Sequence, residues 1–217
     1  TLTLDGTIYK TDDAQTYVAA TGGGNIDITG AATFTTTNDA VAFNTSGVDL
    51  ANNGTTTINT GTGIGDVSFA GALESNGGSN DLLVITSGAG DVTFTGAVGA
   101  TNALGGLDVN SSAGDGDITF SSTIGDSGNA GVVGTTAIGG TATEDVNLAG
   151  LIYSFDGGTT ITAADGDNIK LTGTGDVTFT TAADNIEFAT GHIHLADGSN
   201  LVAVSYTHLT LPTRTHV

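Results

Sequence analysis

The sequence predicts an all-β protein, a right-handed parallel β-helix (β-solenoid) of about seven or eight coils. Three observations predict this fold. A nine-residue phrase returns at intervals of about 26 residues, apolar residues alternate within each copy, and Gly-, Asn- and Ser-rich stretches separate the apolar segments. Repeats of this length are typical of solenoids, whereas an antiparallel sandwich needs about 100 residues per domain.

Six segments carry the repeated phrase, five as close copies and one as a weaker copy. They are DAVAFNTSG from Asp39, GDVSFAGAL from Gly65, GDVTFTGAV from Gly90, GDITFSSTI from Gly116, EDVNLAGLI from Glu144 and GDVTFTTAA from Gly175. Their aromatic or leucine positions recur after roughly 25 to 31 residues, and are Phe43, Phe69, Phe94, Phe120, Leu148 and Phe179. We expect these side chains to share one interior column, with successive coils about 4.8 Å apart.

The copy that begins at Gly65 illustrates the strand pattern. Val67, Phe69 and Leu73 are apolar and Ser68 between them is polar, and this period of two predicts a strand with one buried face. Gly71 takes an inward position, where a missing side chain lets the strand bend or relieves crowding beside the ring. The other copies place Gly96, Ser122 and Gly150 at this position.

A second apolar strand is expected about 13 to 15 residues after the aromatic position, beyond a turn sequence such as SNGGSN. It contains Leu82 and Val84 in one copy and Leu107 and Val109 in the next. A single unit cannot bury its apolar face. Burial stabilises by about 1.5 to 3 kcal/mol for each large side chain only when neighbouring coils cover it.

The charge balance excludes two classes of partner. The chain has 23 acidic and 3 basic residues, a formal charge of -20, which repels nucleic acid and anionic lipid surfaces. It lacks an apolar run of about 18 residues, so we expect no direct membrane insertion. Because Cys is absent, disulfides and thiolate metal sites are excluded. The start, TLTLDGTIYK, has neither an initiator Met nor a leader, which indicates an internal piece of a longer chain.

The chain divides into two parts by composition. We predict that residues 1–203 form the β-helix segment and that residues 204–217 are a non-native tail, disordered or loosely attached. The tail holds the only Pro and the only Arg, Pro212 and Arg214, and contains no Gly. Val204 to Thr213 also resembles the translation of a sequencing-library adapter.

An acidic residue precedes each strand of the full copies. These residues are Asp66, Asp91, Asp117, Asp145 and Asp176. If the coils are in register, their carboxylates form a ladder about 5 Å apart, and Ca²⁺ is the candidate ligand between them. The alternative is that each Asp accepts a hydrogen bond from a backbone amide of its own Gly-Asp turn. No catalytic residue and no other cofactor is predicted.

Three further patterns are weaker candidates for sites. His192 and His194 flank Ile193 on one outward face, but a zinc site needs a third protein ligand, so we interpret them as exposed strand residues. The stretch DGDN at Asp165 to Asn168 lacks the spacing of a calcium loop. Thr-x-Thr pairs suggest an ice-binding face, but other copies lack them and β-propensity explains them: Thr33 with Thr35, Thr93 with Thr95, and Thr178 with Thr180.

The repeats resemble the repeat regions of large filamentous-haemagglutinin-like bacterial adhesins. The opening GTIYKTDDAQTY matches a phrase of that family at Gly6, Ile8, Thr11, Gln15, Thr16 and Tyr17, and Gly150, Ile152 and Tyr153 echo its first half. The resemblance implies a secreted protein at the outer-membrane surface of a bacterium. It implies a non-catalytic stalk or adhesive filament whose partners are glycans, cell-surface proteins or further repeats of the same parent chain.

The alternative function is a carbohydrate-active β-helix enzyme, a polysaccharide lyase or glycosidase. A lyase for acidic polymers needs cationic side chains near the substrate carboxylates, and outside the tail the chain offers only Lys10 and Lys170, far apart in sequence. We therefore predict that the protein is not an enzyme.

Overall fold

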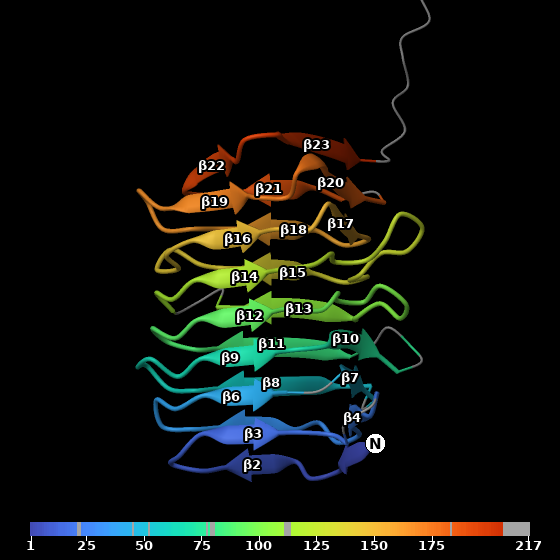
Figure 1. Ribbon diagram of the computed structural model, residues 1–217, viewed down its shortest axis with the longest axis vertical. Helices are drawn as coiled ribbons and strands as arrows, with labels where there is room; N and C mark the ends of the chain where they lie inside the picture. The colour runs from blue at the N-terminus through green and yellow to red at the C-terminus, as the bar shows by residue number, and fades with distance from the viewer. Residues whose placement is uncertain are drawn as a thin grey trace, which may run out of the picture.

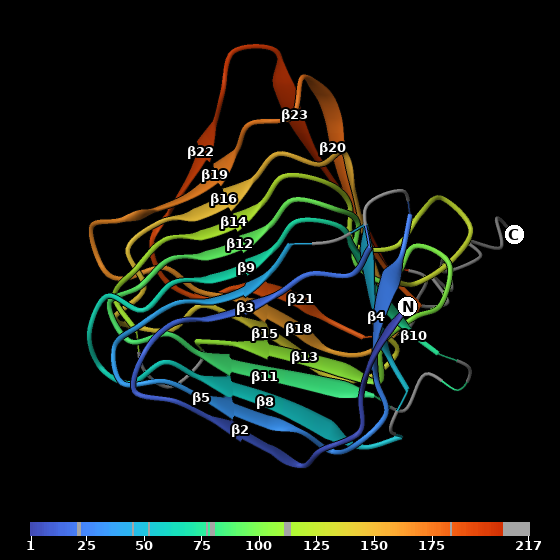
Figure 2. The ribbon, with the colours of Figure 1, turned by 60° about the horizontal axis from the view of Figure 1, so that its bottom comes forward.

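The computed structural model describes residues 1–20, 23–44, 46–51, 53–76, 78, 81–110, 114–182 and 184–205. These residues form an all-β, parallel β-solenoid of about 8 turns with a spacing of about 25 residues (Figure 1). The coil is right-handed when followed from the N-terminal end (Figure 2). The predicted fold class is confirmed. No helix in the described part of the chain is long and apolar enough to cross a membrane.

The coils have three faces, which we call A, B and C in chain order, and most coils contribute one strand to each face. Face B is an eight-stranded sheet of β2 (Ile8–Lys10), β5 (Thr33–Thr35), β8 (Thr55–Asn59), β11 (Leu82–Thr86), β13 (Gly106–Val109), β15 (Thr136–Ile138), β18 (Thr159–Ile161) and β21 (Ile186–Phe188). Face C is an eight-stranded sheet of β3 (Gln15–Tyr17), β6 (Val41–Phe43), β9 (Val67–Phe69), β12 (Val92–Phe94), β14 (Ile118–Phe120), β16 (Val146–Leu148), β19 (Asn168–Leu171) and β22 (His192–Leu195).

Face A is divided into two sheets. The first holds β1 (Leu2–Leu4), β4 (Asn25–Ile28), β7 (Gly47–Leu50) and β10 (Ala72–Ser75), and the second holds β17 (Ile152–Phe155), β20 (Gly175–Thr181) and β23 (Ser199–Ser205). The first two residues of the predicted tail, Val204 and Ser205, belong to β23, and the rest of that tail, residues 206–217, lies outside the described residues. Between the two sheets two coils are joined only by isolated bridges, such as Leu73 to Val98 and Val98 to Ile124. The chain between β14 and β15 projects from these coils as a loop (Figure 1).

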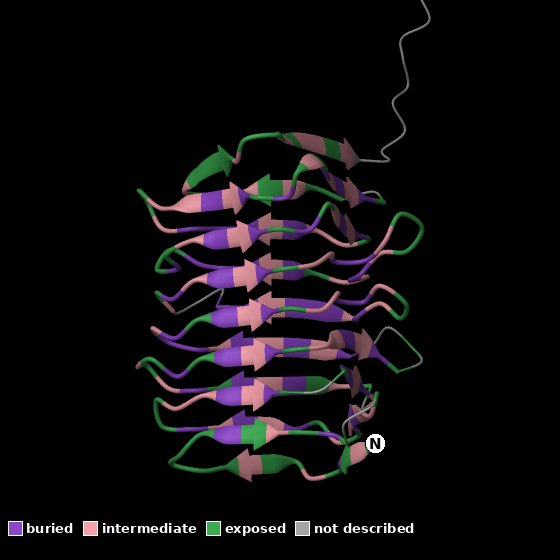
Figure 3. Ribbon diagram, in the orientation of Figure 1, coloured by how far each residue is buried: buried purple, intermediate pink, exposed green. Residues whose placement is uncertain are grey.

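The predicted aromatic column exists on face C. Phe43, Phe69, Phe94 and Phe120 occupy the same register position in neighbouring strands and are at most 1% exposed. Their rings stack with centroids 4.9, 5.1 and 4.6 Å apart, which matches the spacing of parallel strands. Tyr17 extends the column below Phe43 at 5.3 Å. Buried and less buried residues alternate along these strands (Figure 3).

The last member of the predicted column was assigned to the wrong face. Phe179 lies in β20 on face A, where its ring stacks on Tyr153 at 4.9 Å, and Leu171 takes the position above Leu148 on face C. Strands on all three faces bury alternate residues in one core. The period of two therefore predicts a strand but does not indicate the face to which it belongs. The interval from Leu148 to Phe179, the longest between members of the column, was the sign of this change.

In three copies, those from Asp39, Gly65 and Glu144, the nine-residue phrase spans a strand of face C, a corner and the start of a strand on face A. The copies from Gly90 and Gly116 reach face A only as isolated bridges, and the copy from Gly175 begins with the single strand β20. In the copy from Gly65, Val67 to Phe69 form β9 on face C and the chain bends at Ala70 and Gly71 before β10 on face A. Successive corners approach closely, since a Cβ on Gly96 would lie 2.3 Å from the carbonyl carbon of Gly71. The small residue is therefore required by coil stacking at the corner.

The second predicted strand is confirmed as β11 and β13, but its inward residues differ in one copy. Leu107 and Val109 are fully buried in β13, whereas in β11 the fully or nearly fully buried residues are Leu83 and Ile85. Leu82 and Val84 lie on the outer surface of face B, half-buried. Four consecutive apolar residues in LLVI hide the period of two at this point.

The two segments that share the G-x-I-Y pattern have the same local structure. The amide of Gly6 donates to the Tyr9 hydroxyl at 2.8 Å, and the amide of Gly150 donates to the Tyr153 hydroxyl at 2.9 Å. In the first coil, buried Gln15 also donates to the carbonyl oxygen of Tyr9 at 3.1 Å. The sequence similarity between the segments at Gly6 and Gly150 therefore reflects the same turn, although Tyr9 lies on face B and Tyr153 on face A.

Candidate functional site

Four of the five predicted acidic residues form a ladder beside face C, which ends at Asn168. Each carboxylate accepts a hydrogen bond from the backbone amide of the equivalent residue one coil further. These bonds are Asp91 to Asp66 at 2.9 Å, Asp117 to Asp91 at 2.9 Å, Asp145 to Asp117 at 3.0 Å and Asn168 to Asp145 at 2.9 Å. The acceptor role was predicted, but the amide belongs to the next coil and not to the residue's own turn. The ladder therefore binds one coil to another.

A cation completes the ladder at its C-terminal end. The Lys170 ammonium group pairs with Oδ2 of Asp145. Burial of Asp145 opposes its ionisation, but hydrogen bonds from Lys170 and Asn168 outweigh burial and hold the pKa of this carboxyl below its ordinary value. The bond to Asp145 raises the pKa of Lys170.

Asp176, the fifth predicted member, does not belong to the ladder. It lies in β20 on face A, and its Oδ1 accepts a hydrogen bond from the Asn200 side chain at 3.0 Å. Within the described residues, no group of three or more His, Cys, Asp or Glu side chains is placed to hold a metal ion. Calcium binding by the ladder carboxylates stays a prediction.

His192 and His194 lie on β22, the last strand of face C. Register places them outward, above Asn168 and Lys170, while Ile193 continues the inward column of Ile169. Every residue of β22 is exposed because no described strand covers this end of the sheet. The structure thus brings the two imidazoles to one surface.

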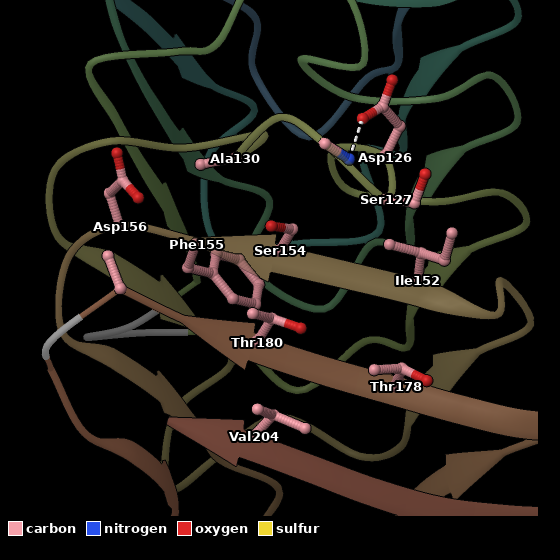
Figure 4. A pocket seen from close by; sticks show the side chains of 12 residues that line it. Asp126, Ser127, Ala130, Ile152, Ser154, Phe155, Asp156, Thr178, Thr180 and Val204 are labelled. Carbon is pink, nitrogen blue, oxygen red and sulfur yellow. Dashed lines mark hydrogen bonds between the residues drawn. The ribbon is translucent and has the colours of Figure 1, made fainter. Parts of the chain in front are cut away.

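A groove hollows the described surface on face A, and the sequence did not predict it. Its volume is about 500 Å³. It is lined by Asp126, Ser127, Gly128, Ala130, Ile152, Ser154, Phe155, Asp156, Thr178, Thr180, Ala182 and Val204 (Figure 4). We call this set the face A groove.

The floor of the face A groove consists of outward residues from adjacent strands. Ile152 pairs in register with Thr178, and Ser154 pairs with Thr180, which in turn pairs with Val204 of β23. The inward neighbours of these residues, such as Phe179, are buried in the core. Period-two alternation therefore holds the floor side chains toward solvent from a rigid sheet.

The wall of the groove is the loop from Gly125 to Gly131. Oδ1 of Asp126 accepts hydrogen bonds from the amides of Gly128 and Asn129, each at 2.7 Å, and the Gly131 amide donates to the carbonyl oxygen of Ser154 at 2.8 Å. The two amide bonds hold the pKa of Asp126 below its ordinary value. The loop is thus closed on itself and attached to β17.

A second, more polar hollow lies on the other side of this loop. It has a volume of about 390 Å³ and shares Gly128, Ala130 and Asp156 with the face A groove. Glu74 orders its far edge by accepting hydrogen bonds from the amides of Thr101, at 3.1 Å, and Asn102, at 2.8 Å. Burial raises the pKa of Glu74. Asp156, which is exposed, stands where the two hollows meet.

Two signals in the sequence mark the groove. The interval between Phe120 and Leu148 is longer than those before it, and the loop DSGNAG at 126–131 lies within this interval. The pair Thr178 and Thr180, one of the Thr-x-Thr pairs, lies on the groove floor. Neither signal predicts that residues of three coils meet at the groove, because this contact depends on the register of β17, β20 and β23.

The geometry defines the chain as a parallel β-solenoid repeat protein. Comparison with known protein families, with curated proteins and with solved structures finds no match. The class therefore rests on the strand register and the stacked core.

Proposed function

We propose that the chain is a non-catalytic structural segment of a large secreted bacterial surface protein, where its coils form part of a stalk or adhesive filament. The observation that carries this proposal is the continuous stack. Faces B and C each run through eight hydrogen-bonded parallel strands, and one aromatic and leucine column follows the whole axis on face C.

This stack is suited to a mechanical role. Backbone hydrogen bonds between coils run along the axis, so stretching the axis loads all three faces at once. At about 4.8 Å per coil, eight coils span only roughly 34 Å, so one such segment is a short piece of a stalk. Repetition of the unit in a longer parent chain supplies the length.

The outer surface suits contact with glycans or cell-surface proteins. The outward column on face C contains Ser68, Thr93, Thr119 and Asn147, which offer hydroxyl and amide groups without charge. The formal charge of -20 disfavours polyanionic partners. Secretion and the bacterial surface are part of this proposal through the family resemblance of the repeats.

Pulling single molecules from their two ends tests the structural role. We expect the coils to detach in steps of roughly 80 to 90 Å, the extended length of about 25 residues. A smooth extension at low force, without steps, contradicts the stalk.

Attachment and turnover test the other two parts of the proposal. Beads coated with the protein should attach to glycan-coated or cell surfaces under flow, more than beads coated with albumin. Incubation with acidic and neutral glycans should release no reducing or unsaturated ends. Sustained release in proportion to protein concentration would favour the enzyme alternative.

A further inference from the structure

We propose that the face A groove binds a neutral oligosaccharide, whose hydroxyls donate hydrogen bonds to the groove carboxylates and exchange hydrogen bonds with its Ser and Thr hydroxyls, and whose rings contact its apolar side chains. This inference rests on the proposed adhesive function and names the place and ligand class for it.

The groove is the point where the solenoid departs from its regular repeat. Elsewhere on faces B and C each coil repeats the previous one, whereas here a loop of one coil stands over strands of the next coils. Binding residues are concentrated on loops that a rigid scaffold positions. The volume of about 500 Å³ lies within the range of about 300 to 1,000 Å³ that is typical of small-molecule sites.

The polar groups of the groove are available to a ligand. Four polar side chains line the groove, those of Asp156, Ser154, Thr178 and Thr180 (Figure 4). None of them forms a hydrogen bond with another described residue. The Asp126 carboxylate is fixed by the loop amides, so it presents acceptor oxygens at low entropic cost. Carboxylates accept hydrogen bonds from sugar hydroxyls, and Ser and Thr hydroxyls both donate and accept.

The apolar part of the groove suits the C–H faces of a sugar ring. Ile152 and Ala130 lie on opposite sides, and Val204 extends the floor onto β23 (Figure 4). A small number of placed polar groups on an apolar lining is the usual composition of a ligand site.

Charge selects against acidic sugars. The lining contains Asp126 and Asp156 but no Lys, Arg or His, and the whole chain carries a formal charge of -20. A uronate or sulfated sugar would therefore meet like charge without a cation to compensate it.

The sheet geometry disfavours a peptide strand in this groove. Strand addition needs a free sheet edge, but β20, at the centre of the floor, is hydrogen-bonded to β17 on one side and to β23 on the other. The centre of the floor thus offers side chains and no unpaired backbone row, and among the described strands the edge of this sheet lies at β23.

Titration of the full chain with trisaccharides, followed by saturation-transfer NMR, tests the proposal. The probes are the neutral sugars maltotriose, cellotriose and laminaritriose, the cationic chitosan trimer, and trigalacturonate. Because the groove is half open, we expect weak binding of at least one neutral trisaccharide and none of trigalacturonate. Tightest binding by the chitosan trimer, or no neutral binding at all, overturns the proposal.

Substitutions locate the site. We expect Asp156→Ala to weaken binding about tenfold and Thr180→Val about threefold, from the loss of one charged and one neutral hydrogen bond. The matched controls are Glu187→Ala, an exposed acid on face B, and Thr57→Val, an outward threonine on face B, which should leave affinity unchanged. Circular dichroism and melting temperature verify that each variant is folded. Equal affinity of groove and control variants overturns the groove as the site.

The bead assay separates this inference from the proposed function. If beads carrying Asp156→Ala with Thr180→Val attach as well as the unchanged protein, the groove is wrong but the adhesive role stands. If the groove binds a trisaccharide but unchanged beads attach to no surface, the groove stands and the adhesive role is wrong.

Discussion

Faces C and A are built from the same coils, but only face C repeats without interruption. On face C every coil adds one strand, one ring or leucine to the column, and, from Asp66 to Asn168, one carboxylate-to-amide bond. On face A two coils lose their strands, and the loop from Gly125 to Gly131 stands over the neighbouring sheet. The comparison teaches that regular stacking holds the solenoid together, whereas the break in the repeat on face A creates a groove that the regular strands of face C do not form.

Removal of a ring from the face C column should have the largest effect on stability. Phe94→Ala leaves a cavity between Phe69 and Phe120, whose rings lie 5.1 and 4.6 Å from it, and should lower the free energy of unfolding by about 3 to 5 kcal/mol. Denaturant titration measures it. The outward neighbour substitution Thr93→Ala is the control and should cost less than about 0.5 kcal/mol. Equal costs at the two positions would contradict the interior column.

Close contact between corners should have the next largest effect. A Cβ on Gly116 would lie 2.2 Å from the carbonyl oxygen of Gly90, so Gly116→Ala must push two coils apart and should cost about 1 to 3 kcal/mol. Gly158→Ala on the face A side has no heavy atom within 4 Å of the added carbon and should be nearly neutral. Comparison of the two melting temperatures checks this, and a similar loss at both sites would refute the packing argument.

The Lys170–Asp145 pair should give a smaller, pH-dependent effect. The pKa of Asp145 is lowered in the folded state, so its contribution is present above the ordinary Asp pKa of about 3.9 and is lost as pH falls through the lower folded value. The raised pKa of Lys170 means that its contribution is lost at high pH, above about 10.4. Because the lysine side chain is 34% exposed, solvent screens the pair, and Lys170→Met should cost about 1 kcal/mol or less at pH 7.

Melting temperatures from pH 2 to 7 test this assignment. The difference between the unchanged protein and Lys170→Met should shrink as pH falls below about 4. A difference that stays constant through this range would show that packing of the lysine stem, and not the ion pair, is responsible.

The loop of face A should affect global stability least. Asp126→Ala removes the acceptor for the amides of Gly128 and Asn129, so these two amides should exchange with deuterium faster while the melting temperature stays unchanged. In the unchanged protein the protection should persist at neutral pH and be lost only below the ordinary Asp range, because the pKa of Asp126 is lowered. A large fall in melting temperature would mean that the loop is part of the core stack.

The sequence by itself determined the repeat, the period-two strands and the members of the column from Phe43 to Leu148, because each depends on residues close together in the chain. It also placed four carboxylates in register through their constant distance from the aromatic position. Only the tertiary structure decided that Phe179 and Asp176 belong to face A, that each ladder carboxylate meets the amide of the next coil, and that residues of three coils enclose the groove. The physical reason is that all three faces bury alternate residues in one core, so the local pattern specifies a strand, while the lengths of the intervening loops decide which face receives it.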